Sequence, residues 1–366
     1  MPTRPLLAGR PPERSNQIVT DLRRQITSGR LAPGDQLPTR AEIETKFGAS
    51  SVTVQRALHR LRRDGFITVN GRRGTYVAPR PPHLTRYALV FPNEPTEASS
   101  WVRFWTALEN EADAMPRRAG VKISCYYSVN NHADSDDYWR LLDDVEAHRL
   151  AGIIFASAPF MLEGSPILEE PGIPRVGIMT EPWRDSVPAV ANDGESFLER
   201  AVDYLAGKGR RRLAAIMPPG HTLARAKLEP LARRHGMTLH PYWVQLVTYH
   251  APEAAGGVAH LLMHEGQHER PDGLIIGDDN LVEHATAGLI AAGVRVPEDI
   301  EVVAHCNFPW PTPSVVPVRR LGFDARAVLQ SAMECLGRQR QGLPVNPLNM
   351  VPAVFEDEVR RPKKDK

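Results

Sequence analysis

Residues 47–77 read FGASSVTVQRALHRLRRDGFITVNGRRGTYV, and this stretch decides the fold of the first part of the 366-residue chain. Val54, Leu58 and Leu61 recur at helical spacing, which predicts a helix with one apolar face turned to a core. Ser50 or Ser51 can cap its start, and Gly65 is well placed to end it in a left-handed conformation. Upstream, an apolar stripe and a capping box predict two further helices, carried by Ile18, Leu22 and Ile26 and by Thr39-Arg40-Ala41-Glu42. Short helices joined by residues 48–50 have the spacing of a helix–turn–helix.

The outward face of the third helix carries short polar side chains first and cations afterwards. A recognition helix needs this order, because small side chains reach base edges and cations lie over phosphates. Gln55 can pair with adenine through two hydrogen bonds, which discriminates by about 1–3 kcal/mol. The alternative is an ordinary surface helix. The outward residues are Ser51, Thr53, Gln55, Arg56, His59, Arg60, Arg62 and Arg63.

Two β-forming runs follow the helix and flank Asn70-Gly71. This dipeptide predicts a tight hairpin, with Arg72 and Arg73 at its tip. A basic hairpin after a recognition helix is typical of a wing that lies along the DNA backbone or enters the minor groove.

The charge is divided unevenly along the chain. Residues 1–82 contain 14 Arg and one Lys against six acidic residues, a net charge of +9, so the rest carries −7. A basic module points to a polyanion, although a solvated basic face gives the same count. We expect a cytoplasmic protein without a membrane span, because no apolar run is long enough, the N-terminus lacks a secretory apolar core, and the three cysteines are widely spaced.

After the basic module, short apolar runs alternate with helix-length amphipathic segments. This rhythm predicts an α/β fold with largely parallel, doubly wound sheets, and the strands are numerous enough for two lobes. The expected strands are 87–91, 122–127, 152–156, 175–179, 213–217, 273–277 and 300–305. We expect a flexible tail at 1–14, a winged helix–turn–helix domain at 15–78, a stiff Pro-rich linker at 79–86, a two-lobed effector domain at 87–358 and a basic tail at 359–366.

Residues 15–78 resemble the winged helix–turn–helix domain of the GntR family, through GRLAPGDQLPTRAEI (29–43), FGASSVTVQRAL (47–58), LRRDGFI (61–67) and GRRGTYV (71–77). Ala41, Ser51 and Gln55 stand where family members often carry DNA-reading arginines, so the operator sequence does not transfer. Arg40 is a substitute cation for the second helix. The expected DNA contacts are Thr39, Arg40, Ser50, Ser51, Thr53, Gln55, Arg56, Arg60, Gly71, Arg72, Arg73 and Gly74.

Residues 87–358 resemble the periplasmic-binding-protein-like effector domain of the LacI/GalR family, best in the second lobe, through ANDGESFLERAVDYLAGKGRRRLAAI (191–216) and GDDNLVEHATAGLIAAGVRVPEDIEVVAH (277–305). The resemblance implies a ligand between the lobes. It nominates Trp101, Phe104, Ser157, Asp193, Arg225, Asp278 and Asn307. His305-Cys306-Asn307 departs from the family's acidic pair, which argues against a simple sugar.

One segment imitates an enzyme motif. His264-Glu265-Gly266-Gln267-His268 spells HExxH, but Gly266 interrupts it and Pro271 follows closely, so we expect the preceding helix to end at His264. An aminotransferase fused to a DNA-binding module would need a Schiff-base lysine, and Lys122, Lys208 and Lys227 lie in no such setting. A transport receptor does not explain the basic front module.

The sequence therefore predicts a regulator without catalytic residues, metal or cofactor. We expect a homodimer that binds two-fold-related half-sites in double-stranded DNA. A small, sugar-like metabolite bound between the lobes is expected to release it.

Overall fold

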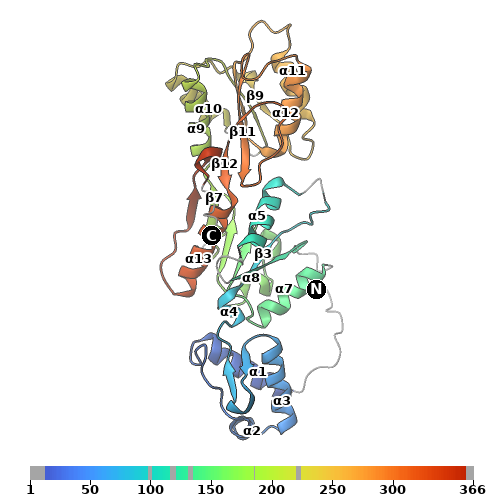
Figure 1. Ribbon diagram of the computed structural model, residues 1–366, viewed down its shortest axis with the longest axis vertical. Coiled ribbons are helices and arrows are strands. Elements are labelled where there is room, and N and C mark those ends of the chain that lie inside the picture. The colour runs from blue at the N-terminus through green and yellow to red at the C-terminus, as the bar shows by residue number, and fades with distance from the viewer. Residues whose placement is uncertain are drawn as a thin grey trace.

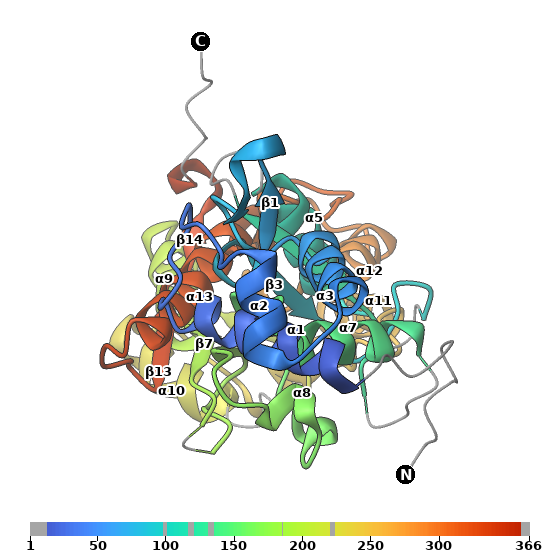
Figure 2. The ribbon, with the colours of Figure 1, turned by 90° about the horizontal axis from the view of Figure 1, so that it is seen from below.

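The structure is a computed structural model that describes residues 13–97, 101–115, 121–130, 135–184, 186–219 and 224–359. Three bodies follow one another along its long axis: a small head, a first α/β lobe and a second α/β lobe (Figure 1). Figure 2 looks along this axis from the side of the head, with α1, α2 and α3 in front of the lobes. No helix in the described ranges is long and apolar enough to cross a membrane. The predicted tails lie largely outside these ranges, at residues 1–12 and 360–366.

The head contains the three predicted helices and a hairpin. Its elements are α1 (Glu13–Thr27), α2 (Arg40–Phe47), α3 (Ser51–Arg63), β1 (Ile67–Val69), η1 (Gly71–Arg73) and β2 (Thr75–Val77). Its core buries the apolar residues expected from the helical spacing, Ile18, Leu22, Ile26, Ile43, Val54, Leu58 and Leu61, together with Phe66. Gly48 and Gly65 both have positive φ, so the predicted helix ends are confirmed.

The wing hairpin is confirmed, but its predicted tight turn is wrong. Val69 pairs with Thr75, so residues 70–74 form a five-residue connection that includes η1. A two-residue type I′ turn needs positive φ at both central residues, whereas Asn70 has φ −108°. Gly71 and Gly74 have positive φ instead. The arginines therefore lie on a broader loop than expected.

Each lobe is built around one six-stranded sheet. In the first the strand order is β13-β7-β6-β5-β3-β4, and all pairs are parallel. Its elements are β3 (Arg86–Val90), α5 (Arg103–Ala114), β4 (Lys122–Tyr126), α7 (Asp136–Glu146), β5 (Gly152–Phe155), η2 (Phe160–Leu162), α8 (Pro166–Glu169), β6 (Arg175–Ile178), β7 (Ala189–Asn192), α13 (Ala325–Arg340) and β13 (Leu348–Val351).

In the second lobe the order is β14-β12-β11-β10-β8-β9, and only the β12–β14 pair is antiparallel. Its elements are α9 (Gly194–Gly207), β8 (Leu213–Met217), α10 (Ala224–Arg234), η3 (Pro241–Trp243), β9 (Val244–Leu246), α11 (Ala254–Met263), β10 (Gly273–Ile276), α12 (Asp279–Ala291), β11 (Glu301–Phe308), β12 (Arg319–Asp324), β14 (Val354–Phe355) and η4 (Glu356–Glu358). The seven strands expected from the apolar runs are therefore confirmed, and β7, β9, β12, β13 and β14 are additions.

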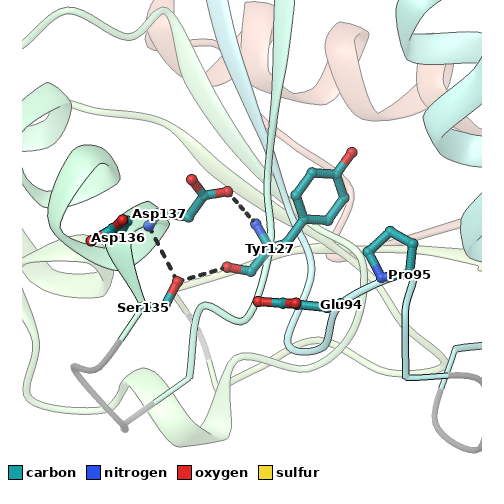
Figure 3. A pocket seen from close by; sticks show the side chains of 6 residues that line it. All are labelled: Glu94, Pro95, Tyr127, Ser135, Asp136 and Asp137. Carbon is teal, nitrogen blue, oxygen red and sulfur yellow. Dashed lines mark hydrogen bonds between the residues drawn. The ribbon is translucent and has the colours of Figure 1, made fainter.

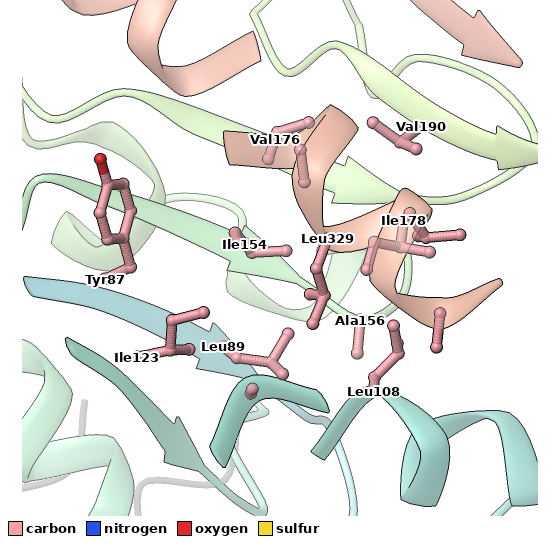
Figure 4. Close-up of a cluster of buried hydrophobic side chains, with 14 of the residues drawn as sticks. Tyr87, Leu89, Leu108, Ile123, Ile154, Ala156, Val176, Ile178, Val190 and Leu329 are labelled. Atoms are coloured by element: carbon pink, nitrogen blue, oxygen red, sulfur yellow. The ribbon is translucent and has the colours of Figure 1, made fainter. Parts of the chain in front are cut away.

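The chain crosses between the lobes three times, after β7, after β12 and after β13. After the second crossing, α13 returns to the first lobe and buries Leu329 against Ile178 and Val190 (Figure 4). Gly152 permits close packing there, because a Cβ at that position would lie 2.7 Å from Cδ1 of Leu336. The crossings place the carboxyl ends of β7 and β11 at the junction of the lobes.

The predicted stiff, extended linker at 79–86 instead contains a turn of helix, α4 (Pro82–Thr85). Pro82 occupies its first position, where the missing N–H is no loss. His83 in this turn stacks on Phe66 of the head, with ring centroids 5.8 Å apart. Burial lowers the pKa of His83 to about 4. The linker is thus packed against the head rather than holding it at a distance.

An ionic cluster joins the head to the first lobe. Asp64, at the end of α3, accepts from Arg23 of α1 at 3.2 Å and from Arg149 of the first lobe at 3.3 Å. Arg149 also bonds Asp143 and Asp144. The end of the third helix is therefore tied directly to the effector domain.

Candidate DNA interface and ligand cleft

The start of α3 is fixed by its cap. Ser50 Oγ accepts from the Thr53 N–H at 3.3 Å, and the Ser50 and Thr53 hydroxyls lie 3.0 Å apart. This confirms the predicted cap. Ser51, Gln55 and Arg56 are exposed on the outer side of the same helix. The first half of α3 thus presents hydrogen-bonding side chains to solvent.

The surroundings of two α3 residues, Arg60 and Val52, were not predicted by the helical periodicity. Arg60 Nη1 donates to Asn16 Oδ1 at 3.0 Å, so this half-buried guanidinium also ties α3 to α1. Val52 is 59% exposed on the first turn of α3, although it is apolar. An exposed methyl-bearing side chain on such a helix can contact the methyl group of thymine.

The start of α2 lies in the same head and is also capped as predicted. Thr39 Oγ1 accepts from the Glu42 N–H at 3.3 Å, and Glu42 accepts from the Thr39 N–H at 2.7 Å. The Thr39 hydroxyl also donates to the Glu42 carboxylate at 2.9 Å. The bond from the Thr39 N–H and this one from the hydroxyl lower the pKa of Glu42. Arg40 follows the cap and is exposed.

The wing loop holds Arg73 on the surface. Its carbonyl accepts from Gln36 Nε2 at 3.3 Å and from the Tyr76 hydroxyl at 2.8 Å. Gly74 has φ +116°, and a Cβ there would lie 2.7 Å from Gln36 Nε2, so the loop requires glycine. The side chain of Arg72 lies outside the described part of the chain.

A cavity of about 410 Å³ lies between the two lobes. Such a volume is in the range of small-molecule sites. Phe104 and Trp105 line it from the first lobe, and Phe197 and Phe323 line it from the second. Arg103 bridges the lobes beside it, because its N–H donates to Asn280 Oδ1 and its guanidinium pairs with Glu283, both at 3.2 Å.

Three buried polar atoms of residues that line this cavity have no hydrogen-bond partner among the residues that the structure describes. They are Oδ1 of Asn192, Nδ1 of His305 and Oδ1 of Asn307. Buried polar groups are normally paired, so an unpaired set in one cavity indicates a place for a ligand. His305 and Asn307 are two apart on β11 and share a face, while Asn192 ends β7.

Two carboxylates lie at the start of α12. Asp278 caps the helix by accepting from the Asn280 N–H at 2.8 Å. Asp279 is buried, and its Oδ2 accepts from Asn307 Nδ2 at 2.7 Å and from the Thr312 hydroxyl at 3.4 Å. Burial raises the pKa of Asp279, and the charge of Asp278 acts in the same direction.

The structure brings three of the seven predicted ligand residues to this cavity: Phe104, Asp278 and Asn307. Sequence reasoning missed Asn192, Asp279 and His305. Asn192 ends a strand that the pattern did not show, whereas His305 lay in the segment that departs from the family.

The other four predicted residues do not line the interlobe cavity. Trp101 packs on Phe91 and donates its indole N–H to Thr106. Ser157 lines a separate cavity of about 350 Å³ in the first lobe. Two further side chains are held by local partners: Asp193 caps α9, and Arg225 pairs with Glu229 at 2.6 Å.

A third hollow, of about 500 Å³, lies on the first lobe between Tyr127 and the start of α7. Its polar groups satisfy one another (Figure 3). Ser135 Oγ donates to the Tyr127 carbonyl at 3.1 Å and accepts from the Asp137 N–H at 3.2 Å, and Asp137 accepts from the Tyr127 N–H at 2.9 Å. Among the described residues that line this hollow, none carries an unpaired buried polar atom like those of the interlobe cavity.

The HExxH segment is not helical. α11 ends at Met263, His264 is its cap residue, and the Gly266 N–H donates to His264 Nδ1 at 3.0 Å. The expected end of the helix is confirmed. Among the described residues, no cluster of His, Cys, Asp or Glu could hold a metal ion.

Comparison with known proteins agrees with the division of the chain into a DNA-binding head and a two-lobed domain. The family model described as bacterial regulatory proteins, gntR family, matches residues 14–77, and that of the periplasmic binding protein-like domain matches residues 202–352. The arabinose metabolism transcriptional repressor of Geobacillus stearothermophilus is 24% identical over 335 residues, which cover 87% of this chain and 90% of the relative. The repressor MngR of the Escherichia coli mannosyl-D-glycerate transport/metabolism system is 44% identical over 61 residues, 17% of this chain and 25% of that protein.

Solved structures show the fold of the two lobes. A putative LacI transcriptional regulator of Bacillus cereus subsp. cytotoxis has a TM-score of 0.55 at 17% identity, over 74% of this chain and 96% of that one. A LacI family regulator of Lactobacillus casei, solved with bound glucose, has a TM-score of 0.53 at 18% identity, over 74% and 98% of the two chains.

A winged helix–turn–helix head on a two-lobed, periplasmic-binding-protein-like domain defines a DNA-binding transcriptional regulator, not an enzyme. More specifically, residues 14–77 match the gntR family model and residues 202–352 match the periplasmic binding protein-like domain, and the two lobes share the fold of LacI regulators.

Proposed function

We propose that this regulator is a homodimeric repressor that reads two-fold-related half-sites in the cytoplasm and is released by a small molecule bound between its lobes. Repression is supported by the relative that covers most of the chain, which is a repressor of arabinose metabolism. The glucose-bound LacI relative supports a sugar or sugar derivative as the starting set for the effector. A dimer is supported by the small size of one head, because a single recognition helix makes few base contacts and paired half-sites supply the rest.

The observation that carries DNA reading is the exposed polar face at the start of α3. We assign base reading to Ser51, Gln55 and Val52 and phosphate contacts to Arg56 and Arg73. Ser50, Thr53, Thr39, Arg40 and the glycines Gly71 and Gly74 position the helices and the wing. Arg60 and Arg72 remain candidate phosphate contacts.

Selection of binding sites from a random duplex pool tests this assignment. The wild type is expected to enrich a two-fold-related motif, and Gln55→Ala is expected to lose preference at one base pair by about 1–3 kcal/mol. Arg184→Ala is the matched control, since this exposed arginine lies in the first lobe and pairs with Glu163. Enrichment of a single asymmetric half-site by monomeric protein would contradict the dimer.

The effector site rests on the unpaired atoms of Asn192, His305 and Asn307. Screening sugars, polyols, amines and acids for release of the selected duplex identifies the effector. Asn192→Ala is expected to weaken release and to leave ligand-free DNA binding unchanged. Asp193 and Arg225 stay candidates, and their alanine variants belong in the same assay.

A further inference from the structure

Two of the unpaired buried atoms that line the interlobe cavity are carbonyl oxygens, which only accept hydrogen bonds. Asn307 is 1% exposed, and its Nδ2 is already used on Asp279 at 2.7 Å, so the atom left without a partner is the carbonyl oxygen Oδ1. If the Asn307 amide were flipped, its oxygen would face the oxygen of the Asp279 carboxylate, and the two would repel. The orientation in which Nδ2 donates to Asp279 is therefore the favoured one. Asn192 adds a second unpaired carbonyl oxygen.

The donors of the neighbouring amide are used inside the protein. Asn280 gives its N–H and its Nδ2 to Asp278 Oδ1, at 2.8 and 2.7 Å. Arg103, the cation beside this cluster, directs its guanidinium to Glu283. The donors of Asn280 and Arg103 are therefore paired within the protein, whereas the carbonyl oxygens of Asn192 and Asn307 are not.

Negative charge accompanies these acceptors. Asp278 and Asp279 are adjacent in sequence, and both line the cavity. Asp279 is 2% exposed, and its hydrogen-bond partners, Asn307 and Thr312, are neutral. His305 and Arg103 act on its carboxyl group through positive charge but donate no hydrogen bond to it among the described contacts. A buried carboxylate is stable only when a cation, a proton or several hydrogen bonds compensate it. A ligand cation would supply that compensation, whereas a ligand anion would be repelled.

Aromatic side chains line the rest of the cavity and can contact the carbon skeleton of a cationic ligand. Phe104 and Trp105 face the cavity from one lobe, and Phe197 and Phe323 from the other. Aromatic faces bind apolar carbon skeletons and attract cations.

We propose that the cleft selects a small organic cation: a protonated amine held by Asp278, Asp279 and the free oxygens of Asn192 and Asn307, with its carbon skeleton between the aromatic walls. This inference rests on the proposed effector function of the cleft. An ammonium group carries three donors and no acceptor, which matches the two unpaired carbonyl oxygens; His305 Nδ1 joins them in the neutral tautomer in which it accepts. Sugar phosphates and sugar acids are disfavoured as effectors because they are anions. An amino sugar is both a cation and a sugar derivative, so it agrees with this inference and with the effector class given under the proposed function.

Three probes with one skeleton test the proposal: benzylamine, benzyl alcohol and benzoate. Binding to the full-length protein is measured by saturation-transfer NMR titration at neutral pH and constant ionic strength. Benzylamine is protonated there, as alkyl amines are. We expect benzylamine to bind at least about tenfold more tightly than benzyl alcohol and benzoate to show no transfer, since one charge contact of about 1.4 kcal/mol is a tenfold effect.

Asp279→Asn is expected to abolish the advantage of benzylamine over benzyl alcohol. Asp278→Asn provides a second variant, because asparagine still caps the helix. Asp299→Asn, in an exposed pair with Arg295, is the matched control and should change nothing. Benzoate binding as tightly as benzylamine, no transfer from benzylamine, or an advantage that survives both cleft variants would overturn the proposal. An acidic or neutral effector in the release screen would also overturn the cation proposal, but it would leave the proposed function of the cleft intact. Amine binding that depends on Asp279 but releases no DNA would support the cation proposal and contradict the proposed effector function.

Discussion

Arg149→Met tests how the head is held on the first lobe. The guanidinium of Arg149 reaches Asp64 at 3.3 Å, and the two side chains are only 13% and 2% exposed. Removing one partner of a buried ion pair costs about 3–5 kcal/mol. Asp64 keeps its contact with Arg23 at 3.2 Å, so we expect the lower end. About 3 kcal/mol weakens docking of the head by roughly 150-fold.

Hydrogen exchange in α4 measures this docking. The Leu84 N–H donates to the Pro81 carbonyl at 3.0 Å, and the turn that contains this bond lies between head and lobe. In Arg149→Met its exchange should accelerate by up to about 150-fold, while amides in the central strand β5 keep their protection. Arg184→Met is the control, because its ion pair with Glu163 is exposed and worth at most about 1 kcal/mol. Wild-type exchange of α4 in Arg149→Met would refute the idea that this ionic cluster holds the head.

Further predictions concern packing, the wing and a cap. A Cβ at Gly288 would lie 2.1 Å from the Gly256 carbonyl oxygen. Gly288→Ala should therefore lower the free energy of unfolding by about 1–3 kcal/mol, measured by urea titration. Gly257→Ala is the control and should not lower it, because a Cβ there meets nothing within 4 Å. Arg73→Ala should reduce the slope of log affinity against log salt by about 1, measured by anisotropy on duplex DNA, and an unchanged slope would remove Arg73 from the interface. Thr39→Ala should cost about 1 kcal/mol of stability in thermal melts, because the capping box is lost; an unaltered melt would contradict this.

Local features of the head followed from the sequence because local chemistry determines them. Ser50, Thr39 and Gly65 cap or end helices through backbone hydrogen bonds and φ values that the neighbouring residues alone dictate. The wing loop shows the limit of such reasoning. Asn70-Gly71 favours a tight turn, but Gln36 bonds the Arg73 carbonyl and Leu37 N–H bonds Thr75, so contacts from a distant segment set the loop.

The cleft was less accessible from the sequence, because it forms where three crossings bring distant segments together. Asp278 could be transferred from the family pattern, since it follows a strand with a clear apolar run. Asn307 was also nominated, although it lies near the end of β11 in the segment that departs from that pattern. Asn192 lies in the matching stretch 191–216 but was not nominated, because the short strand that it ends follows proline-containing sequence and was not predicted. The unpaired state of His305 depends on which partners the fold supplies, and no spacing in the sequence encodes it.

We infer that the exposed start of α3 and the basic wing together read duplex DNA. Competition of the selected duplex against random duplex at about 150 mM salt measures this directly. We expect at least about a 10³-fold preference for the selected duplex. Equal affinity for the selected and random duplexes would contradict it.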